Sequence, residues 1–414
     1  MWISESDFNF LSSVVGYAVL ATQLFGGYLT DKFSSKKLLG FSTIMVGVFS
    51  LWWTILTLVP WLKGDNNDIL TKKGVDSDEW QAILNNYHNE LYSQYLIIYI
   101  GWGVCIGLLF WAPLWKLTSQ LAEKNEQGAI YGIQGSLVGL CGFVFMGLIG
   151  GGVFWIIDSI NPKFLFQGFS FLAALLLISS GSLALIYFHN DNKTGAFKGQ
   201  GIKEIFIDLI KPMKSLRLWL AAFFVLGMYM FQSVFSGYMN SWLAKFDKEF
   251  TKYQITFLVV AFASTRSYLL RLFIASPFGR FAQKRKSIVL VLIVCLVIGL
   301  IFATLFVSIP SFFAAEDIVK QMTETQQKIL YWSMYIIYFI VGIISWMIVT
   351  LRFVQIDELP VSKENYGSAV GFISLIAFTP DGWFYTAAGA IGEARHGKGA
   401  YSLETYQIIL GIAL

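Results

Sequence analysis

Two charged side chains lie inside long apolar runs of this chain. Arg266 falls near the middle of the run 257–278, and Asp381 follows Pro380 inside the run 367–391. An ionised group at bilayer depth costs about 3 kcal/mol on insertion scales, so it is usually retained for a polar cavity, a partner or a pathway. A guanidinium in a low-dielectric cavity binds carboxylate, phosphate or sulfonate through two parallel hydrogen bonds. The two residues therefore predict that something polar is handled inside a membrane.

Each of these residues has two interpretations. Arg266 is the first candidate for substrate contact, and the alternative is a structural ion pair with Asp381 or a bond to a backbone carbonyl. Asp381 is a candidate proton acceptor for symport, or else a permanent counter-ion of Arg266. Pro380 removes a backbone donor and predicts a loosened or kinked helix beside Asp381.

A polar stripe in a neighbouring run could line the same cavity. Its members recur at i, i+3, i+4, i+7 and i+11, which is one face of an α-helix: Tyr229, Gln232, Ser233, Ser236 and Asn240. The alternative is polar packing between helices. Gln134, on a glycine-rich run, is a secondary candidate for substrate contact. Arg271 is interpreted as snorkelling or structurally paired. Lys116 and Arg352, near span ends, either attract an anion or follow the preference for basic residues on the cytoplasmic side.

The elements that position these residues are membrane-spanning helices. The chain has 414 residues, of which 56% are hydrophobic and only 14% charged, against about a quarter charged in soluble domains. Runs long enough to cross a bilayer, about 20 residues each, occur at 8–30, 38–60, 94–118, 128–157, 164–188, 218–242, 254–278, 287–309, 330–354 and 367–391. Lipid leaves exposed backbone groups unsatisfied, so all are expected to be helices. The run 405–414 is too short to cross.

Loop charges predict the topology and the domains. Basic residues fill the loops 31–37, 190–216 and 279–286, which lie on one side if the spans alternate, so that side is expected to be cytoplasmic, together with the loops 119–127 and 355–366. The opposite segment 61–93 is acidic, and Asp76 with Glu79 predicts a short capped helix there, lying on the membrane surface or over the spans. The basic segment 191–216 reads as an interfacial linker between an N-terminal bundle, 1–190, and a C-terminal bundle, 217–414.

Several function classes are excluded by what the sequence lacks. The net charge of +4 is too small to indicate a nucleic-acid partner. The three cysteines show no metal or redox spacing, and no phosphate-binding loop or nucleophile–base arrangement is present. We expect no enzyme activity, no cofactor and no metal. The expected partners are a small-molecule substrate, the lipid bilayer and, through Asp381, protons.

A repeated turn carries a family resemblance. The turn 26–38, with Gly27, Asp31 and Lys32, resembles the signature loop of major facilitator transporters, and a similar turn at 279–284 has Gln283 where an aspartate is expected. The resemblance implies an all-α polytopic protein with two pseudo-symmetric helical bundles around a midplane site, working by alternating access. It also implies that Asp31 faces the start of the helix at Gly367, and that Gly27, Asp31 and Lys32 form a conformational gate.

Further stretches are similar to the bacterial sugar-phosphate and organic-anion permease branch. They are Phe110-Trp111 with Lys116, residues 126–128 before Tyr131-Gly132, and residues 358–360 leading to Gly367, Gly371 and 379–381. This resemblance implies transport of a small organic anion across the cell membrane. The alternatives are a transporter of a neutral solute, such as a peptide or sugar, and a non-transporting or degenerate relative. Against the family pattern, the first helix is expected to be absent and the last to be cut short at Leu414.

Overall fold

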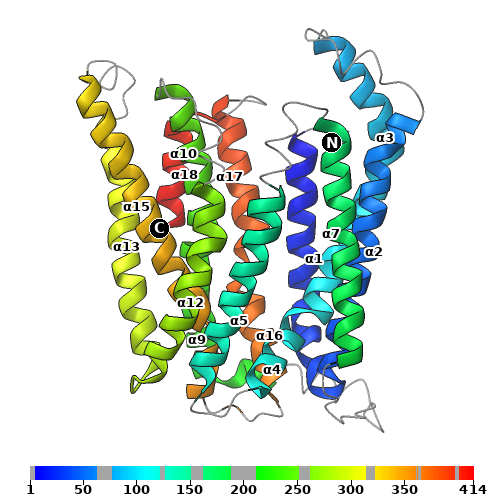
Figure 1. Cartoon of the computed structure of the whole chain (residues 1–414), viewed down its shortest axis with the longest axis vertical. Coiled ribbons are helices and arrows are strands. Elements are labelled where there is room, and N and C mark those ends of the chain that lie inside the picture. The colour runs from blue at the N-terminus through cyan, green and yellow to red at the C-terminus, as the bar shows by residue number, and fades with distance from the viewer. Residues whose placement is uncertain are drawn as a thin grey trace.

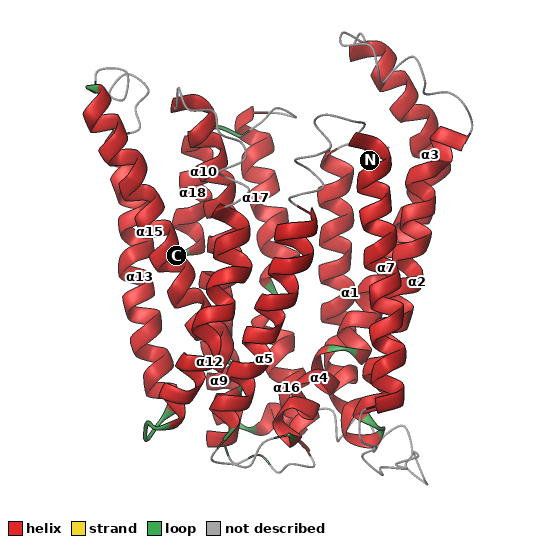
Figure 2. Ribbon diagram, viewed as in Figure 1, coloured by secondary structure: helices red, strands yellow, loops and turns green. Residues whose placement is uncertain are grey.

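The computed structural model describes residues 5–62, 77–121, 126–150, 162–187, 211–250, 262–313, 322–359, 361, 365–396 and 401–414. Within these ranges the chain is helical almost throughout and contains no strand (Figure 2). Eight of the described helical stretches are long and apolar enough to cross a membrane. The predicted all-α polytopic class is confirmed.

The first part of the chain contributes one group of helices. These are α1 (Glu5–Lys32), α2 (Ser35–Leu62), α3 (Ser77–Leu109), α4 (Trp111–Gln120), α5 (Gln127–Gly142), its π-helical continuation η1 (Phe143–Gly150) and α7 (Pro162–Tyr187). Helix α1 packs along α3, and α2 packs along α7 (Figure 1). The short helix α4 follows α3 directly after Phe110.

The second part contributes the other group. It comprises η2 (Lys211–Lys214), α9 (Leu216–Tyr229), η3 (Met230–Phe235), α10 (Ser236–Phe250), η4 (Thr265–Leu269), α12 (Leu270–Gln283), α13 (Ile288–Phe313), α15 (Glu324–Leu351), η5 (Val354–Glu358), α16 (Tyr366–Ala377), α17 (Pro380–His396) and α18 (Leu403–Ala413). Helix α13 packs along α15, and α16 packs against α9.

Two predicted elements differ from the structure, and a third is described only in part. The expected span 254–278 begins among residues outside the described ranges, and its described part runs from 262 to 283. The expected span 367–391 is two helices, α16 and α17. The separate outer helix expected after Asp76 is instead the first part of the continuous helix α3, whereas Asp76 itself and most of the expected linker 191–216 lie outside the described residues.

The break between α16 and α17 follows from proline chemistry. Pro380 has no backbone N–H and is favoured at the first position of a helix, where that donor has no partner anyway. Helix α16 accordingly ends at Ala377, and α17 starts at Pro380. The predicted weakening at Pro380 is confirmed as a complete interruption. It leaves Asp381 in the first turn of α17, where the helix dipole favours a negative charge.

The two groups of helices contact each other through two crossed pairs. Helix α1 of the first part packs along α16 of the second, and α5 of the first part packs along α12 of the second. In Figure 1, α5 of the first group and α16 and α17 of the second lie in the middle of the molecule, where the two groups meet. Glycines permit the approach: a Cβ atom at Gly27 would lie 2.9 Å from Gly371 Cα, and one at Gly132 would lie 2.7 Å from Ala275 O.

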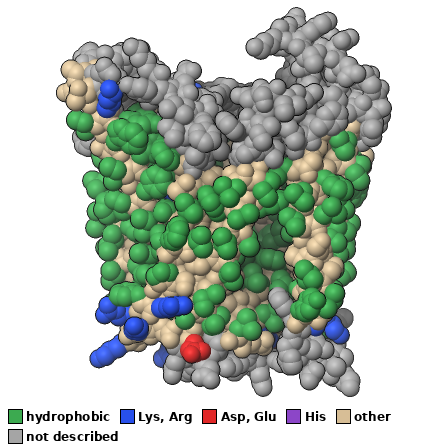
Figure 3. Space-filling view, in the orientation of Figure 1, with side chains coloured by type: hydrophobic (Ala, Val, Ile, Leu, Met, Phe, Trp, Pro, Cys, Tyr) green, Lys and Arg blue, Asp and Glu red, His purple; other side chains and the backbone are tan. Residues whose placement is uncertain are grey.

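The outer surface matches a lipid environment. Large apolar side chains remain exposed on the outer helices, as at Leu290 and Ile301 of α13. In Figure 3 hydrophobic side chains cover the middle of the visible face, and Lys and Arg side chains gather mainly at one end. That face is hollowed between the two groups of helices. Because the backbone N–H and C=O groups are hydrogen-bonded within the helices, a surface of this kind is stable in lipid.

Candidate functional site

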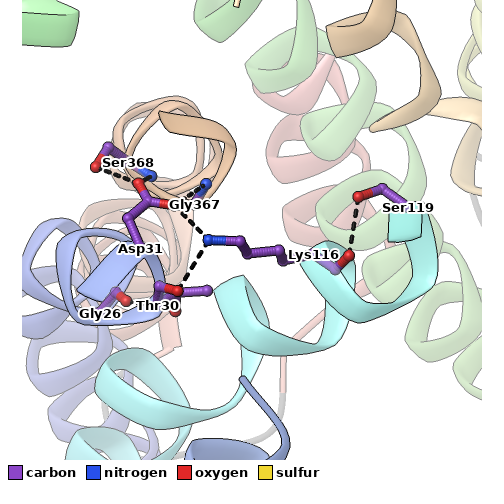
Figure 4. Close-up of polar contacts among 7 residues, drawn as sticks. All are labelled: Gly26, Thr30, Asp31, Lys116, Ser119, Gly367 and Ser368. Atoms are coloured by element: carbon purple, nitrogen blue, oxygen red, sulfur yellow. Dashed lines mark hydrogen bonds and ion pairs between the residues drawn. The ribbon is translucent and has the colours of Figure 1, made fainter. Parts of the chain in front are cut away.

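Asp31 joins the two groups of helices at the end of α1 (Figure 4). Its carboxylate accepts hydrogen bonds from the Gly367 N–H at 3.0 Å, the Ser368 N–H at 2.7 Å and the Ser368 hydroxyl at 2.6 Å. Lys116 forms an ion pair with the same carboxylate at 2.6 Å and donates to Thr30 O at 2.9 Å. A carboxylate at the first turn of α16 is stabilised by the free N–H groups and the helix dipole.

These contacts place Asp31 where the resemblance implied, at the start of the helix that begins near Gly367. They also assign Lys116 to an ion pair, which neither of its interpretations at the end of a span had included. Gly27 provides the close approach of α1 to α16, and the Lys32 ammonium lies 5.4 Å from the centroid of the Tyr28 ring. We call the Asp31, Lys116, Gly367 and Ser368 contacts the latch.

Gln283 makes the corresponding contact at the other crossed pair. Its side-chain oxygen accepts a hydrogen bond from the Ala129 N–H, in the first turn of α5, at 3.1 Å. The sequence had left the second lock open because an amide stands where an aspartate was expected. The structure therefore has one charged cap and one neutral cap at equivalent positions. The amide keeps the hydrogen bond and gives up the interaction of a full charge with the helix dipole.

Arg266 is enclosed by polar and aromatic partners. It is 5% exposed, and its Nε donates to Tyr338 O at 3.1 Å while a terminal nitrogen donates to Ser236 Oγ at 2.9 Å. Its guanidinium lies over the Tyr338 ring, 4.4 Å from the centroid. The side chain fits because residue 342 is glycine, where a Cβ atom would lie 2.7 Å from Arg266 Cγ.

Arg266 is therefore bonded to a carbonyl, which was one form of the structural alternative, and Asp381 is not its partner. The arrangement differs from a guanidinium that faces an open chamber. Its predicted role in substrate contact stays a prediction, and two of its nitrogens, Nε and one terminal nitrogen, already donate hydrogen bonds within the bundle.

Asp381 has a different set of neighbours. The Tyr229 hydroxyl lies 2.7 Å from one carboxylate oxygen and 2.8 Å from the other. Arg352 interacts electrostatically with the same carboxylate. From the first part of the chain, α1 approaches closely, since a Cβ atom at Gly16 would lie 2.7 Å from Asp381 O. The carboxylate thus stands where the two groups of helices meet.

Arg352 is the buried cation that the sequence placed only at a span end. It is 8% exposed, and its guanidinium lies 5.2 Å from the Phe353 ring centroid, 5.3 Å from that of Phe378 and 5.9 Å from that of Tyr229. It forms no ion pair or hydrogen bond through its side chain to any residue that the structure describes, and its Nε is buried without a partner. The helix α15 ends at Leu351 while still inside the bundle, so hydropathy alone gave no signal of this position.

Arg271 is a second cation beside an aromatic ring, although its side chain is only half-buried. Its guanidinium lies 4.8 Å from the Trp346 ring centroid, and its Nε is buried with no hydrogen-bond partner among the described residues. It also interacts electrostatically with Arg352. A Cβ atom at Gly135 would lie 3.9 Å from Arg271 Nε, so α5 of the first part borders this cation. Of the structural partners expected for Arg271, the described residues therefore supply the face of the Trp346 ring.

The polar stripe divides between two neighbours. Tyr229 precedes the π-helical segment η3, whereas Ser236 and Asn240 follow it. A π-helical turn contains an extra residue, so it rotates the positions that follow relative to α-helical spacing. Tyr229 points to Asp381, while Ser236 bonds Arg266 and Asn240 accepts a hydrogen bond from the Tyr338 hydroxyl at 2.7 Å. The prediction of a single α-helical face was wrong for this reason.

The remaining predicted side chains have fewer partners. Ser233 is half-buried beside Tyr229 and Tyr385. Gln232 and Gln134 are half-buried, and neither makes a hydrogen bond to another described residue. Gln134 lies next to Gly135 on α5, the helix that packs on α12. Among the described residues no three His, Cys, Asp or Glu side chains gather in a way that would hold a metal ion.

The fold defines a class: a multi-pass helical membrane protein whose two groups of helices meet around buried charges. Comparison with known proteins gives the family. The pattern of the Major Facilitator Superfamily matches residues 3–379, and the chain therefore belongs to that superfamily. Members of this family are transporters, so the chain is a secondary transporter of a small molecule and not an enzyme.

Individual relatives agree with this assignment. The uncharacterized MG294 homolog of Mycoplasma pneumoniae is 33% identical over 439 residues, which cover 100% of this chain and 82% of that protein. The human organic anion transporter MFSD10 (TETRAN) superposes with a TM-score of 0.56 at 12% identity, covering 98% of this chain and 82% of that one.

The proton:xylose symporter XylE, bound to 6-bromo-6-deoxy-D-glucose, superposes with a TM-score of 0.58 at 15% identity, covering 98% and 84%. Identities this low show the common fold alone. The resemblance to the sugar-phosphate branch stays a prediction.

Proposed function

We propose that the protein carries a small organic anion across the cell membrane by alternating access, together with a proton. The observation that carries the proposal is Arg352, a buried guanidinium without an acidic hydrogen-bonding partner. Arg271 stands as the second cation. An anion that enters between the bundles satisfies hydrogen-bonding directions that the protein leaves open on both side chains.

The charge balance supports an anionic substrate. Arg271 and Arg352 carry two positive charges against the one negative charge of Asp381. Buried charges of one sign are costly unless they are paired. A bound anion reduces this excess, and the aromatic faces around Arg352 stabilise the guanidinium while the site is empty. Arg266, whose Nε and one terminal nitrogen already donate to Tyr338 O and Ser236 Oγ, supports the walls of the site in this proposal.

Asp381 is the proton carrier in this proposal. It interacts with Arg352 and accepts the Tyr229 hydroxyl, so an incoming anion and the carboxylate compete for the same cation. Protonation of Asp381 removes that competition. Uptake of the proton and binding of the anion therefore favour each other, which is the thermodynamic requirement for symport.

The latch closes one side of this path. In the proposed topology the loops at 31–37, 119–127, 190–216, 279–286 and 355–366 face the cytoplasm, as the positive-inside rule predicts. The bonds of Asp31 to Gly367, Ser368 and Lys116 then hold the cytoplasmic ends of α1 and α16 together. Their separation, with that of α5 and α12, is the opening movement of a rocking-bundle transporter.

The test begins with a panel of compounds and the purified protein. Thermal unfolding is measured with mono- and dicarboxylates, organophosphates and sulfonates, each beside a neutral compound of similar size. A compound that binds the folded state raises the unfolding temperature by mass action. Uptake of each stabilising compound into proteoliposomes is then measured with and without an inward proton gradient.

The variants Arg352→Gln and Arg271→Gln should lose at least ten-fold in uptake, because one lost charge-assisted contact weakens binding by about 1.5–3 kcal/mol. Arg285→Gln is the matched control, since Arg285 is exposed and lies outside the spans. Unchanged anion uptake in both the Arg352→Gln and the Arg271→Gln variant would refute the site.

A neutral solute is the second candidate, favoured by the amides of Gln134 and Gln232, which have no described hydrogen-bonding partner. It predicts stabilisation by uncharged sugars or peptides and uptake independent of substrate charge. A non-transporting relative predicts neither stabilisation nor uptake.

A further inference from the structure

The interface between α1 and α16 contains polar atoms that no described residue satisfies. Gln23 on α1 and Ser374 on α16 are both fully buried. The side-chain oxygen and nitrogen of Gln23 and the hydroxyl of Ser374 have no hydrogen-bond partner. Neither residue belongs to the latch or to the cluster around Arg352.

The register of the two helices places these residues opposite each other. Helices α1 and α16 run antiparallel, since Asp31 meets Gly367 and Gly27 meets Gly371. Further along, Gly16 meets Asp381 at the start of α17. Residue numbers in each of these pairs add to 397 or 398, so Gln23 lies across from Ser374. A Cβ atom at Gly371 would lie 3.0 Å from Gln23 O, which fixes the contact at this level.

A buried amide rarely stays without hydrogen bonds. Leaving donors and acceptors unsatisfied inside a protein is costly, and buried water characteristically fills the role where two to four polar groups converge. Gln23 supplies one acceptor and one donor group, and Ser374 supplies a hydroxyl that acts as either. We infer that Gln23 and Ser374 together bind a buried water between α1 and α16.

The proposed water site lies on the path between the buried charges and the latch. It lies between Asp381 and the latch, about seven residues, or two helical turns, from each along α1. On the latch side, the glycine contact of Gly27 with Gly371 leaves no room for a side chain between the helices. The water is therefore sealed from the Lys116 end while α1 and α16 are together. When those helices separate, the same polar atoms become a wetted part of the opened path.

The test is a double-mutant cycle on thermal unfolding of the full chain in detergent or nanodiscs. Gln23→Leu and Ser374→Ala each remove polar atoms at nearly constant shape. If both residues hold one water, each single change lowers the unfolding temperature by about 2–4 °C. The double variant should then lose clearly less than the sum, because the water is already gone after the first change. Gln23→Met, which is unbranched, replaces Gln23→Leu if that variant does not fold.

The control pairs Ser374→Ala with Gln94→Leu on α3, whose side-chain oxygen accepts a hydrogen bond from Trp52 Nε1 at 3.3 Å. Shifts in this pair should add, because Gln94 contacts a different helix. Additive shifts from Gln23→Leu and Ser374→Ala would overturn the shared water. A rise in unfolding temperature in either single variant would overturn it as well, because it would mean that the polar atoms are dry and that removing them relieves a cost.

Discussion

At the scale of single residues, the molecule treats the buried Arg266 and Arg352 and the half-buried Arg271 in two different ways. Arg266 has a carbonyl, a hydroxyl and an aromatic ring as partners. Arg352 and Arg271 have aromatic faces and each retains an unpartnered Nε. A donor already used within the protein contributes to stability, whereas an unused donor is available to a ligand at the expense of stability.

This difference leads to a prediction about stability. Arg266→Ala should lower the free energy of unfolding by on the order of 2–4 kcal/mol, because it leaves a cavity and removes the hydrogen bonds to Tyr338 O and Ser236 Oγ. Arg352→Gln breaks no hydrogen bond to a described residue and should change it by less than about 1 kcal/mol. Chemical or thermal unfolding of both variants under one condition compares them. Equal losses would mean that Arg352 is as firmly bonded as Arg266.

The sequence located these residues along the chain but not their neighbours. Arg266 and Asp381 were conspicuous because hydropathy marks any charge inside an apolar run. Their supposed pairing failed because Tyr229 and Arg352 occupy the space around Asp381, and Ser236 and Tyr338 occupy that around Arg266. A π-helical turn between Tyr229 and Ser236 separated the two sets of contacts. No spacing rule for an α-helix could have foreseen that rotation.

At the scale of elements, the starts of α16 and α5 carry one charged and one neutral cap, Asp31 and Gln283. The charged cap also pairs with Lys116, whose side chain is 1% exposed, and the carboxylate is 7% exposed. Breaking a buried pair by removing one member leaves the other unpaired, and that is more costly than removing both. Replacing Asp31 and replacing Lys116 should therefore lower the free energy of unfolding by very different amounts.

Asp31→Asn should lower the free energy of unfolding by about 3 kcal/mol, since Lys116 then keeps its charge without a counter-ion. Adding Lys116→Met to Asp31→Asn should recover most of that loss. Lys116→Met alone should cost less, about 1–2 kcal/mol, because Asp31 keeps three donors at the start of α16. Unfolding curves of the four proteins test this order. No recovery in the double variant would show that Lys116 acts independently of Asp31.

Elements themselves were partly predictable. The break near Pro380 followed from the missing N–H of proline, and α18 (Leu403–Ala413) is as short as the sequence indicated. The outer segment after Asp76 was predicted as a short separate helix because Asp76 and Glu79 have the spacing of a capping box. Its residues from Ser77 instead continue into α3, since a helix already propagating continues unless a proline or glycine interrupts it. Hydropathy reports where lipid begins and not where a helix does.

At the scale of the whole molecule, the crossed pairs α1 with α16 and α5 with α12 tie each group of helices to the other. The repeated turns at 26–38 and 279–284 lie beside these pairs, so an internal resemblance in the sequence corresponds to equivalent contacts in space. The resemblance could be recognised because glycines are needed wherever two helices come within a backbone contact. The sequence alone could not show which residue of the partner helix each glycine contacts, and the structure was needed for that.

The orientation of the molecule follows from its charged ends and leads to the last prediction. Lys286 follows α12 at the same end as the latch and is exposed, whereas Thr325 lies at the start of α15, at the opposite end, and is also exposed. The positive-inside rule assigns the Lys286 end to the cytoplasm. In a background with Cys105, Cys141 and Cys295 replaced, Thr325→Cys should react with a membrane-impermeant maleimide in intact cells. Lys286→Cys should react only after the membrane is permeabilised. The reverse pattern would invert the topology and move the latch to the outer side, while the same labelling of both cysteines in intact cells would contradict a single fixed orientation.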